Sequence, residues 1–451
     1  KVVDNERLVK IEKGSRTLRQ AITEIVGIQD LELRVVGNHI LINAPVKREH
    51  PMEQVVDTLA HFVLEGTLLD KKNGVPIVYA TVGVEGTSIG SITNQAGEFR
   101  LHLADSLRRK SLVFSHVGYV AQKIDIPLLT AGQHFTLTLE PRIFPLQEVV
   151  IRVVHPIRLM REMLEKRMIN YSQKPVYFTT FYREGVQYKQ KFRSLTEAVF
   201  KSPVQSLYAR EQVKLLKMSR ITDGLEQDTL IARMSGGIDA CLQLDIINHL
   251  PDFLLADAHK DVYAYTSADV TIVGDHLVNV ISFEQKKEVK EPLYCGELYI
   301  DSDNGALLQA QIRIHPRYMK QATDMVVQRQ ARRMKIVLQE LTYTISYKPW
   351  NGTYYINHVR GDLHFKVKQK RQWLGSSSLH TWFEMVTCKI DTVGVTRFQR
   401  NERISTRTVF ADTHFKYDSD FWEDFNVIPW EKQLVEVIEQ LTSKIEKIEY
   451  E

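Results

Sequence analysis

The sequence predicts a mainly β fold with smaller α+β parts. Stretches in which apolar and polar residues alternate, the pattern of half-buried strands, recur from position 62 to position 390. Turns rich in glycine and asparagine separate these stretches, and helical periodicity is confined to a few short segments. We therefore expect a small β-α-β-β module, a β-sandwich and a large antiparallel β-rich C-terminal domain with peripheral helices.

The composition is that of an ordinary globular protein. The chain has 451 residues, of which 43% are hydrophobic and 25% charged, and this excludes disorder along its whole length. No run of 18 apolar residues is present, so no transmembrane helix is expected. With 59 basic and 55 acidic residues, the charge is too even to make nucleic acid the expected partner.

Three cysteines, Cys241, Cys295 and Cys388, are widely spaced and form no CxxC pair. This spacing argues against a disulfide framework and against a cysteine zinc site. Two alternatives stay open: three buried thiols, which we favour, or one disulfide with one free thiol. No apolar signal segment follows Lys1, so we expect any signal peptide to have been removed or never to have existed.

Residues 1–45 are predicted to form the β-α-β-β module. A helix at 17–26 is followed by alternating residues on both sides of a tight turn at Gly37-Asn38. The text TLRQAITEIVGIQDLELRVVGNHILINA resembles the secretin/TonB short N-terminal (STN) domain. This resemblance implies a periplasmic module that contacts partner proteins, and the alternative is a generic miniature of the same topology. A linker is expected at 46–61.

Residues 62–141 are predicted to form a small Ig-like β-sandwich of short strands with frequent glycine turns. The text EGTLLDKKNGVPIVYATVGVEGTSIGSITNQAGEFRLHL, with the later strand at 115–119, closely resembles the carboxypeptidase regulatory-like domain. The resemblance implies an accessory sandwich without peptidase chemistry. Asn94 stands where that family usually has an acidic residue, so no cation is expected at this turn.

The same sandwich opens SusC-type outer-membrane receptors, in which the pattern Leu-x-Glu-Val-Val follows it. Residues 146–150 have this pattern. A receptor would continue into a plug and a barrel of about 22 strands, and the strands alone would need roughly 220 residues. Because only 301 residues follow position 150, and the last of them are charged and helical, we expect an envelope protein without plug and barrel.

Residues 142–451 are predicted to form the antiparallel β-rich domain. The expected helices are at 156–170, 238–255 and 430–449. Hairpin turns are expected at 303–305 and 351–352, and separate strands at 353–359 and 363–367. The texts GELYIDSDNGALLQAQIRI and NYSQKPVYFTTFYREGV resemble C-terminal regions of envelope proteins that carry the same sandwich. The succession of strands also resembles the open half-barrel of LolA-type lipoprotein carriers.

Two short motifs raise the possibility of a hydrolase acting on glycan or peptide. Ser88 lies in a G-x-S-x-G match, and His50 with Glu53 matches the H-x-x-E ligand pair of zinc carboxypeptidases. A nucleophile elbow needs a helix after the turn, and the zinc site needs a third ligand in a large catalytic domain. The sequence predicts neither context, so we expect no catalytic residue, no cofactor and no metal.

Charged clusters are candidates for ligand binding. A group with metal-ligand chemistry comprises His249, Asp252, Asp257, His259 and Asp261. Leucine and phenylalanine are interleaved with it, which favours a capping and surface role. A basic cluster at 366–371 alternates with Phe365 and Val367, so its charges share one strand face. A solvated face is expected there, with anionic lipid headgroups or glycan as the alternative; a second basic cluster lies at 329–335.

The last predicted helix has an apolar seam with a period of 3.5 residues over about two heptads. The residues that we predict to contact a partner are Trp422, Phe425, Trp430, Leu434, Ile438 and Leu441. Packing of this helix on its own domain is the alternative that we favour, because two heptads are too few for a coiled coil.

These observations predict a non-enzymatic protein of the periplasm or the periplasmic side of the outer membrane. Its expected role is that of an accessory or scaffold subunit that binds an outer-membrane β-barrel protein complex, with peripheral membrane or lipid contact and no nucleic acid. The alternative is a carrier of a hydrophobic ligand, a lipid or lipoprotein, in a LolA-like half-barrel.

Overall fold

The computed structural model divides into two units, residues 1–60 and residues 61–451. The residues that it describes are 32–36, 39–43, 60–142, 155–171, 174–204, 211–222, 232–234, 237–255, 257–274, 276–330, 334–369, 375–406, 422, 425–431 and 434–436. In the first unit, β1 (Glu32–Val36) pairs antiparallel with β2 (His39–Asn43), which confirms the predicted hairpin. The predicted helix at 17–26 lies outside the described residues.

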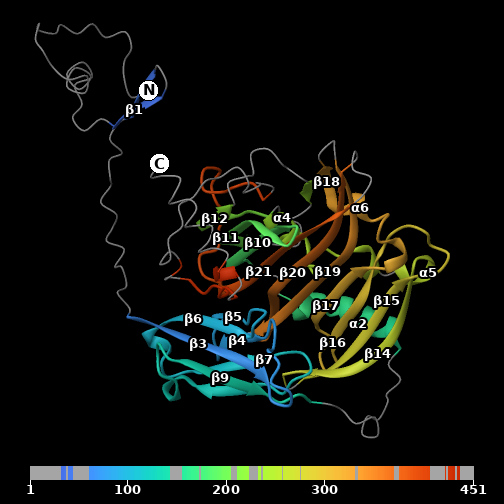
Figure 1. The fold of residues 1–451 in the computed structure, drawn as a ribbon. Helices are drawn as coiled ribbons and strands as arrows, with labels where there is room; N and C mark the ends of the chain where they lie inside the picture. The colour runs from blue at the N-terminus through green and yellow to red at the C-terminus, as the bar shows by residue number, and fades with distance from the viewer. Residues whose placement is uncertain are drawn as a thin grey trace, which may run out of the picture. The chain divides into compact units, whose positions relative to one another are not determined.

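The second unit begins with the predicted β-sandwich (Figure 1). Its sheets have the strand orders β6-β3-β9 and β5-β4-β7-β8. The strands are β3 (His61–Asp70), β4 (Thr81–Val84), β5 (Gly90–Ile92), β6 (Glu98–Ala104), β7 (Ser111–Ser115), β8 (Gln122–Asp125) and β9 (His134–Leu139), with short 3₁₀ turns η1 (Asp105–Leu107) and η2 (Ile126–Leu128). Alternate residues of β3 are buried, because successive strand side chains point to opposite faces. Leu64, Phe99 and Phe114 lie in the resulting core.

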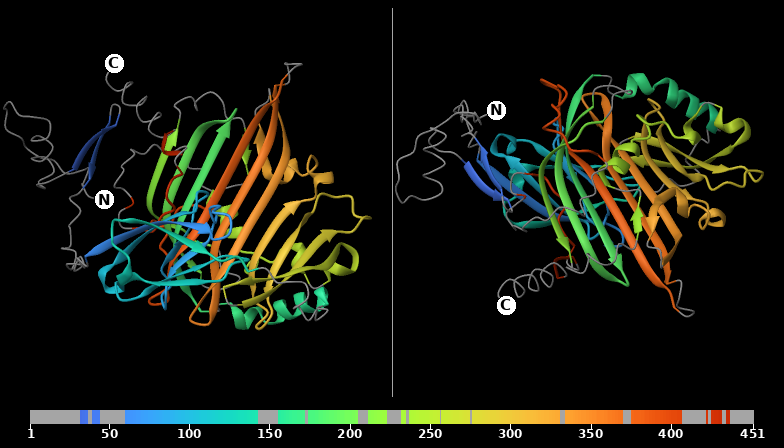
Figure 2. Two further views of the ribbon diagram at one scale, coloured as in Figure 1. Left: turned by 60° about the horizontal axis from the view of Figure 1, so that its bottom comes forward. Right: turned by 90° about the horizontal axis from the view of Figure 1, so that it is seen from above.

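The rest of the unit is built on a ten-stranded antiparallel sheet of order β12-β11-β10-β21-β20-β19-β17-β16-β15-β14. Figure 2 shows these strands lying side by side in one twisted sheet. They are β10 (Val176–Tyr188), β11 (Lys191–Val204), β12 (Lys214–Thr222), β14 (Tyr263–Val273), β15 (His276–Gln285), β16 (Tyr294–Asp301), β17 (Leu307–Ile314), β19 (Met334–Trp350), β20 (Thr353–Gln369) and β21 (Ser377–Asp391). A small separate sheet pairs β13 (Ala232–Met234) with β18 (Val327–Gln330).

Helices cover one face of the large sheet, which we call the inner face. The helical elements are α2 (Pro156–Glu165), α3 (Arg167–Asn170), α4 (Gly237–Gln243), η4 (Asp252–Leu254), α5 (Ala258–Asp261), η5 (Pro316–Tyr318) and α6 (Thr323–Val326). Met163 of α2, Cys241 of α4 and Phe253 of η4 join one apolar core with inner-face residues such as Phe178 and Leu338. This core supplies most of the burial in the domain.

The opposite, outer face is covered by the sandwich and by residues 425–431, which we call the strap. Phe181 and Val386 of the sheet pack with Ile92 of the sandwich and Ile428 of the strap. Next to the sandwich, the Gly118 N–H donates to the carbonyl of Ile272 in the edge strand β14. The sandwich and the sheet are therefore joined by direct contacts within one unit.

Two predicted boundaries need correction. The stretches predicted as separate strands on either side of Gly361 form one continuous strand, β20. Gly361 marks no turn; a Cβ atom there would lie 2.4 Å from the ring of Phe383, so glycine makes room for that ring. The predicted helical insertion at 238–255 is helical only in α4 and η4, because turns around Asp245 and Pro251 interrupt it.

Other predictions are confirmed. The turn at 351–352 joins β19 to β20, and Asn351 and Gly352 adopt positive φ values of 49° and 73°, as a two-residue hairpin turn requires. The predicted helix at 156–170 is present as α2 and α3. All three cysteines are free and buried. Among the described residues, no helix is long and apolar enough to cross a membrane.

Candidate functional site

A small pocket, partly open to solvent, lies between the inner face of the sheet and α4. Its apolar lining residues come from β10, β11, α4, β20 and β21, and they are Phe178, Pro203, Val204, Leu242, Ile356 and Met385. Its polar lining residues are Thr180, Ser202, Glu211, Gln212, Asp245, Asn248 and His249. Side chains of these strands and of α4 with its following turn enclose the space between them.

Asp245 is the most deeply buried charged group of the pocket lining. Its carboxylate accepts hydrogen bonds from the Tyr347 hydroxyl (2.9 Å) and from the Asn248 side-chain amide (2.6 Å). Burial raises the pKa of Asp245 above its ordinary value, although these hydrogen bonds act in the opposite direction. The carboxyl group is therefore held in place by Asn248, from the turn that follows α4, and by Tyr347 of β19.

An ion pair stands beside Asp245. The imidazole Nε2 of His249 lies 2.8 Å from a carboxylate oxygen of Glu211. This hydrogen bond raises the pKa of His249 despite the opposing effect of burial. Both side chains are partly exposed, 32% for His249 and 23% for Glu211, so the pair borders the pocket on its solvent side.

One lining hydroxyl is left unsatisfied. Ser202 is only 3% exposed, and its Oγ has no hydrogen-bond partner among the described residues. Such a buried orphan costs free energy unless something fills the site, because it has lost water without gaining a partner. The Ser202 hydroxyl therefore retains unused hydrogen-bonding capacity in the lining of the pocket.

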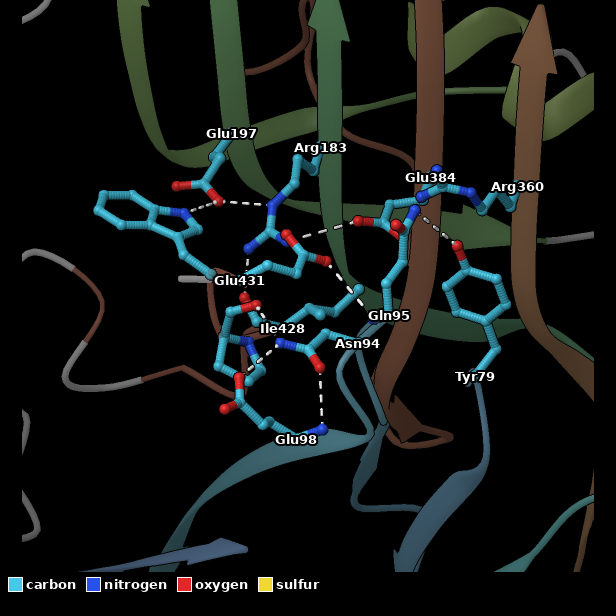
Figure 3. A network of polar contacts seen from close by, with 12 residues as sticks. Tyr79, Asn94, Gln95, Glu98, Arg183, Glu197, Arg360, Glu384, Ile428 and Glu431 are labelled. Carbon is cyan, nitrogen blue, oxygen red and sulfur yellow. Dashed lines mark hydrogen bonds and ion pairs between the residues drawn. The ribbon is translucent and has the colours of Figure 1, made fainter. Parts of the chain in front are cut away.

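A row of four charges crosses the outer face on neighbouring strands, Glu197–Arg183–Glu384–Arg360 (Figure 3). We call it the charge row, and each member is at most 4% exposed. Nε of Arg183 lies 2.7 Å from Glu197, and its Nη1 lies 3.5 Å from Glu384. Nη1 of Arg360 lies 3.2 Å from Glu384 on the other side. Opposite charges thus alternate along the row and compensate one another.

The sandwich and the strap close over the charge row. Arg183 also donates to the carbonyl of Ile428, and the Trp430 indole N–H donates to Glu197 at 2.7 Å. The guanidinium of Arg360 lies 5.2 Å from the ring centre of Tyr79 in the sandwich. Each cover therefore contributes a polar or aromatic partner as well as apolar area.

Asn94 of the sandwich binds the strap directly. Its side-chain amide donates to Glu98 (3.0 Å) and to the carbonyl of Pro429 (3.2 Å), while its Oδ1 accepts from the N–H groups of Ala96 and Glu98. A carboxylate at this position could not donate. The departure from the family pattern noted at Asn94 therefore has a structural use in this chain.

Ser88 helps to join the sandwich to the large sheet. Its hydroxyl donates to the carbonyl of Ile390 at 2.9 Å and accepts from the N–H of Ile390 at 3.0 Å. The Lys348 ammonium nearby donates to the carbonyl of Thr387 at 2.8 Å, and burial lowers the pKa of this lysine to about 8. His50 and Glu53 lie outside the described residues.

The residues predicted to contact a partner lie against the chain itself. Trp422 and Phe425 pack on the outer-face core with Phe181, while Trp430 and Leu434 pack with Trp382. Ile438 and Leu441 lie outside the described residues, as does most of the predicted helix at 430–449. The four described residues anchor the strap region, and a contact of theirs with a partner stays a prediction.

Among the described residues, the candidate ligand groups predicted from sequence do not gather as a set of three. His249 pairs with Glu211, and Asp252 is exposed at the start of η4. Among the described residues, only His276, Asp301 and Asp303 bring three potential metal-ligand atoms within 4.8 Å of one another. Asp301 already accepts hydrogen bonds from its own hairpin and from His276, so it closes the turn between β16 and β17.

The exposed Lys366 and Lys368 alternate with buried Phe365 and Val367, as predicted.

Residues 64–151 match the family model of the CarboxypepD_reg-like domain. This part of the chain is therefore a domain of that family, and the described strands from β3 to β9 form its sandwich. The family comparison gives no match to an STN domain, so that resemblance stays a prediction. No match was found among proteins of curated function.

Three solved structures are distantly similar to the chain. One is a domain from Vibrio parahaemolyticus described as an outer membrane lipoprotein-sorting protein, with 10% identity, a TM-score of 0.23, and coverage of 55% of this chain and 94% of the other. A DUF1329 family protein from Desulfovibrio piger has 10% identity and a TM-score of 0.23, with coverages of 54% and 96%. MucB in complex with MucA has 11% identity and a TM-score of 0.15, with coverages of 52% and 98%.

Neither the pocket nor the charge row was found from sequence. The sequence analysis singled out none of the four residues of the charge row. A usable signal was the presence of both charge signs on the same face of several neighbouring strands, because solvated faces do not require such pairing. The sequence pattern held no signal for Ser202, since its missing partner is a property of the assembled pocket.

Proposed function

We propose that this protein is a non-enzymatic binding protein of the bacterial envelope, and that its large domain carries a small apolar or amphipathic ligand on the inner face. The pocket between the sheet and α4 is the observation that supports this proposal. Its lining combines six apolar residues with polar side chains, as small-molecule sites do.

The filled core sets a limit on the ligand. Side chains from α2, α4 and η4 occupy most of the inner face, so the pocket suits one short chain or a small molecule better than a lipid with several acyl chains. The bonding of Ser88 to backbone groups of Ile390 supports a non-enzymatic role, because it uses the hydroxyl to join two parts of the chain.

The test measures binding of an environment-sensitive naphthylamine probe to the full chain, together with native mass spectrometry of the purified protein. One displaceable site per chain is expected. Leu242→Trp, which fills the pocket from α4, should abolish it, whereas Leu277→Trp at a position 43% exposed on β15 should not. Absence of probe binding and of any co-purified small molecule would sink the proposal.

A second proposal is that the protein is an accessory subunit of an outer-membrane β-barrel complex on the periplasmic side. The CarboxypepD_reg-like domain at 64–151 supports it, since the sandwich is held firmly on the large sheet and presents a fixed surface. Affinity purification from solubilised membranes is the test. Recovery of the chain alone, with no barrel protein, would contradict this second proposal and leave the ligand-carrier proposal untouched.

A further inference from the structure

The pocket lining has a one-sided electrostatic character. Its acidic residues are Glu211 and Asp245, and its single basic residue is His249. The imidazole of His249 is already committed to Glu211 at 2.8 Å. Among the described residues that line the pocket, none is lysine or arginine. An anionic head group would therefore meet two carboxylates and no uncommitted cation.

The lining offers hydrogen-bond acceptors instead. Ser202 Oγ is buried without a partner among the described residues. The Glu211 carboxylate is bound on one oxygen by His249, and among the described residues its second oxygen has only a long 3.5 Å contact from Gln243. Each carboxylate oxygen accepts about two hydrogen bonds, so acceptor capacity is left over in the pocket. A head group that donates hydrogen bonds would use this capacity.

The apolar side of the pocket determines the rest of the ligand. Phe178, Leu242, Ile356 and Met385 come from three strands and one helix and supply a wall without charges. Burial of a short alkyl chain against this wall is favourable in proportion to its area. A ligand that satisfies both sides is an amphiphile with an apolar body and a donor head.

We infer that the pocket selects a short-chain amphiphile with a primary ammonium head, accepts the corresponding alcohol less well, and rejects the corresponding carboxylate. This inference rests on the proposed ligand-binding function. The ammonium supplies three donors and a positive charge, which matches the surplus of acceptors and of negative charge around Ser202, Glu211 and Asp245. A hydroxyl supplies one donor without charge, and a carboxylate supplies none.

The experiment is calorimetric titration of the full chain with octylamine, octanol and octanoate below their micelle concentrations at pH 7.5. At this pH the amine is protonated, as a lysine side chain is. We expect octylamine to bind at least about tenfold more tightly than octanol, a ratio within reach of one charge-assisted hydrogen bond, and octanoate not to bind. Equal binding of all three, or tighter binding of octanoate, would overturn the inference.

Variants separate this inference from the proposed function. Glu211→Gln keeps an acceptor for His249 and removes a charge, so it should lower octylamine affinity about tenfold and leave octanol affinity unchanged. Glu85→Gln, at an exposed site of the sandwich, is the matched control. Leu242→Trp should abolish binding of both ligands, and Val204→Trp replaces it if that variant does not fold.

The failures are distinguishable. If the wild-type chain binds none of the three compounds, both the proposed function and this inference fail. If it binds all three alike and Leu242→Trp abolishes that binding, the pocket is an apolar site as proposed and only the ammonium preference is wrong. If Glu211→Gln weakens octanol as much as octylamine, the charge of Glu211 does not set the preference.

Discussion

On the inner face of the ten-stranded sheet, α2, α4 and η4 pack against apolar side chains, whereas on the outer face the sandwich and the strap cover a row of four buried charges. Apolar packing tolerates small shifts, because it is non-directional. Buried charge pairs tolerate few such shifts, because a buried charge that loses its partner strongly destabilises the folded state. The outer face therefore favours one placement of the sandwich, while the inner face can leave a pocket open.

The charge row and the pocket also differ in how completely their polar groups are satisfied. In the charge row, Arg183, Glu197, Glu384 and Arg360 all have charged partners. In the pocket, Ser202 Oγ has no partner among the described residues. A satisfied network is suited to holding parts of a protein together, and an unsatisfied one is suited to receiving a ligand.

Removal of one cation from the charge row should have the largest effect. Arg183→Met keeps most of the side-chain volume but leaves Glu197 without its ion pair and Glu384 with Arg360 alone. We expect a loss of about 3–5 kcal/mol in the free energy of unfolding, measured by urea denaturation, because a buried carboxylate loses its compensation. Lys123→Met, which breaks an ion pair with Glu85 that is about half exposed, is the control and should cost no more than about 1 kcal/mol. Equal losses in the two variants would refute the distinction between the faces.

His358, next to the charge row, should make the free energy of unfolding decrease as the pH falls. It is 1% exposed, its ring centre lies 5.0 Å from that of Tyr79 in a tilted arrangement, and burial lowers its pKa to about 3. The folded protein keeps this imidazole neutral, while the unfolded chain protonates it below about pH 6.5. Its contribution to stability is therefore complete above pH 6.5 and is lost as the pH falls towards 3.

The measurement compares the free energies of unfolding at pH 7.5 and pH 4.5. His358→Gln should reduce the difference between them by about 2–3 kcal/mol, since about two pH units of this linkage are covered at about 1.4 kcal/mol each. Measurements at pH 7.5 and pH 8.5 supply the internal control, because between them the wild-type and variant curves should run parallel. A variant as acid-sensitive as the wild type would show that His358 is not the origin of the effect.

The sequence predicted the framework of both faces but not what covers them. The alternation of Phe365 and Val367 with Lys366 and Lys368 follows from local strand geometry, and so it was predictable. The ion pairs of Arg183 were not, because they depend on strand register and on a cover from residues more than two hundred positions away. The pocket depends on where α4 ends beside β10 and β11, and single-sequence periodicity holds no information on such packing.

Asn94 tests the attachment of the strap to the sandwich. Asn94→Asp keeps the acceptor that receives the N–H groups of Ala96 and Glu98, and replaces only the donor that binds Glu98 and Pro429. We expect a loss of about 1–2 kcal/mol in stability, because a carboxylate then faces two acceptors. Hydrogen exchange of residues 425–431 should become faster, while exchange in β19 and β20 should not change. Unchanged exchange in the strap would show that Asn94 does not hold it.

Ser202→Ala should have the smallest effect on stability, and it should be of opposite sign. The substitution removes a buried hydroxyl that makes no hydrogen bond with the described residues, so the folded ligand-free chain loses no partner and gains relief from desolvation. We expect the free energy of unfolding to stay constant or rise by up to about 1 kcal/mol. Ser111→Ala is the matched control, because Ser111 is 6% exposed and its hydroxyl donates to Asp125 at 2.6 Å; it should destabilise. If Ser202→Ala costs as much as Ser111→Ala, the Ser202 hydroxyl has a structural partner, and the pocket then resembles the charge row in being satisfied without a ligand.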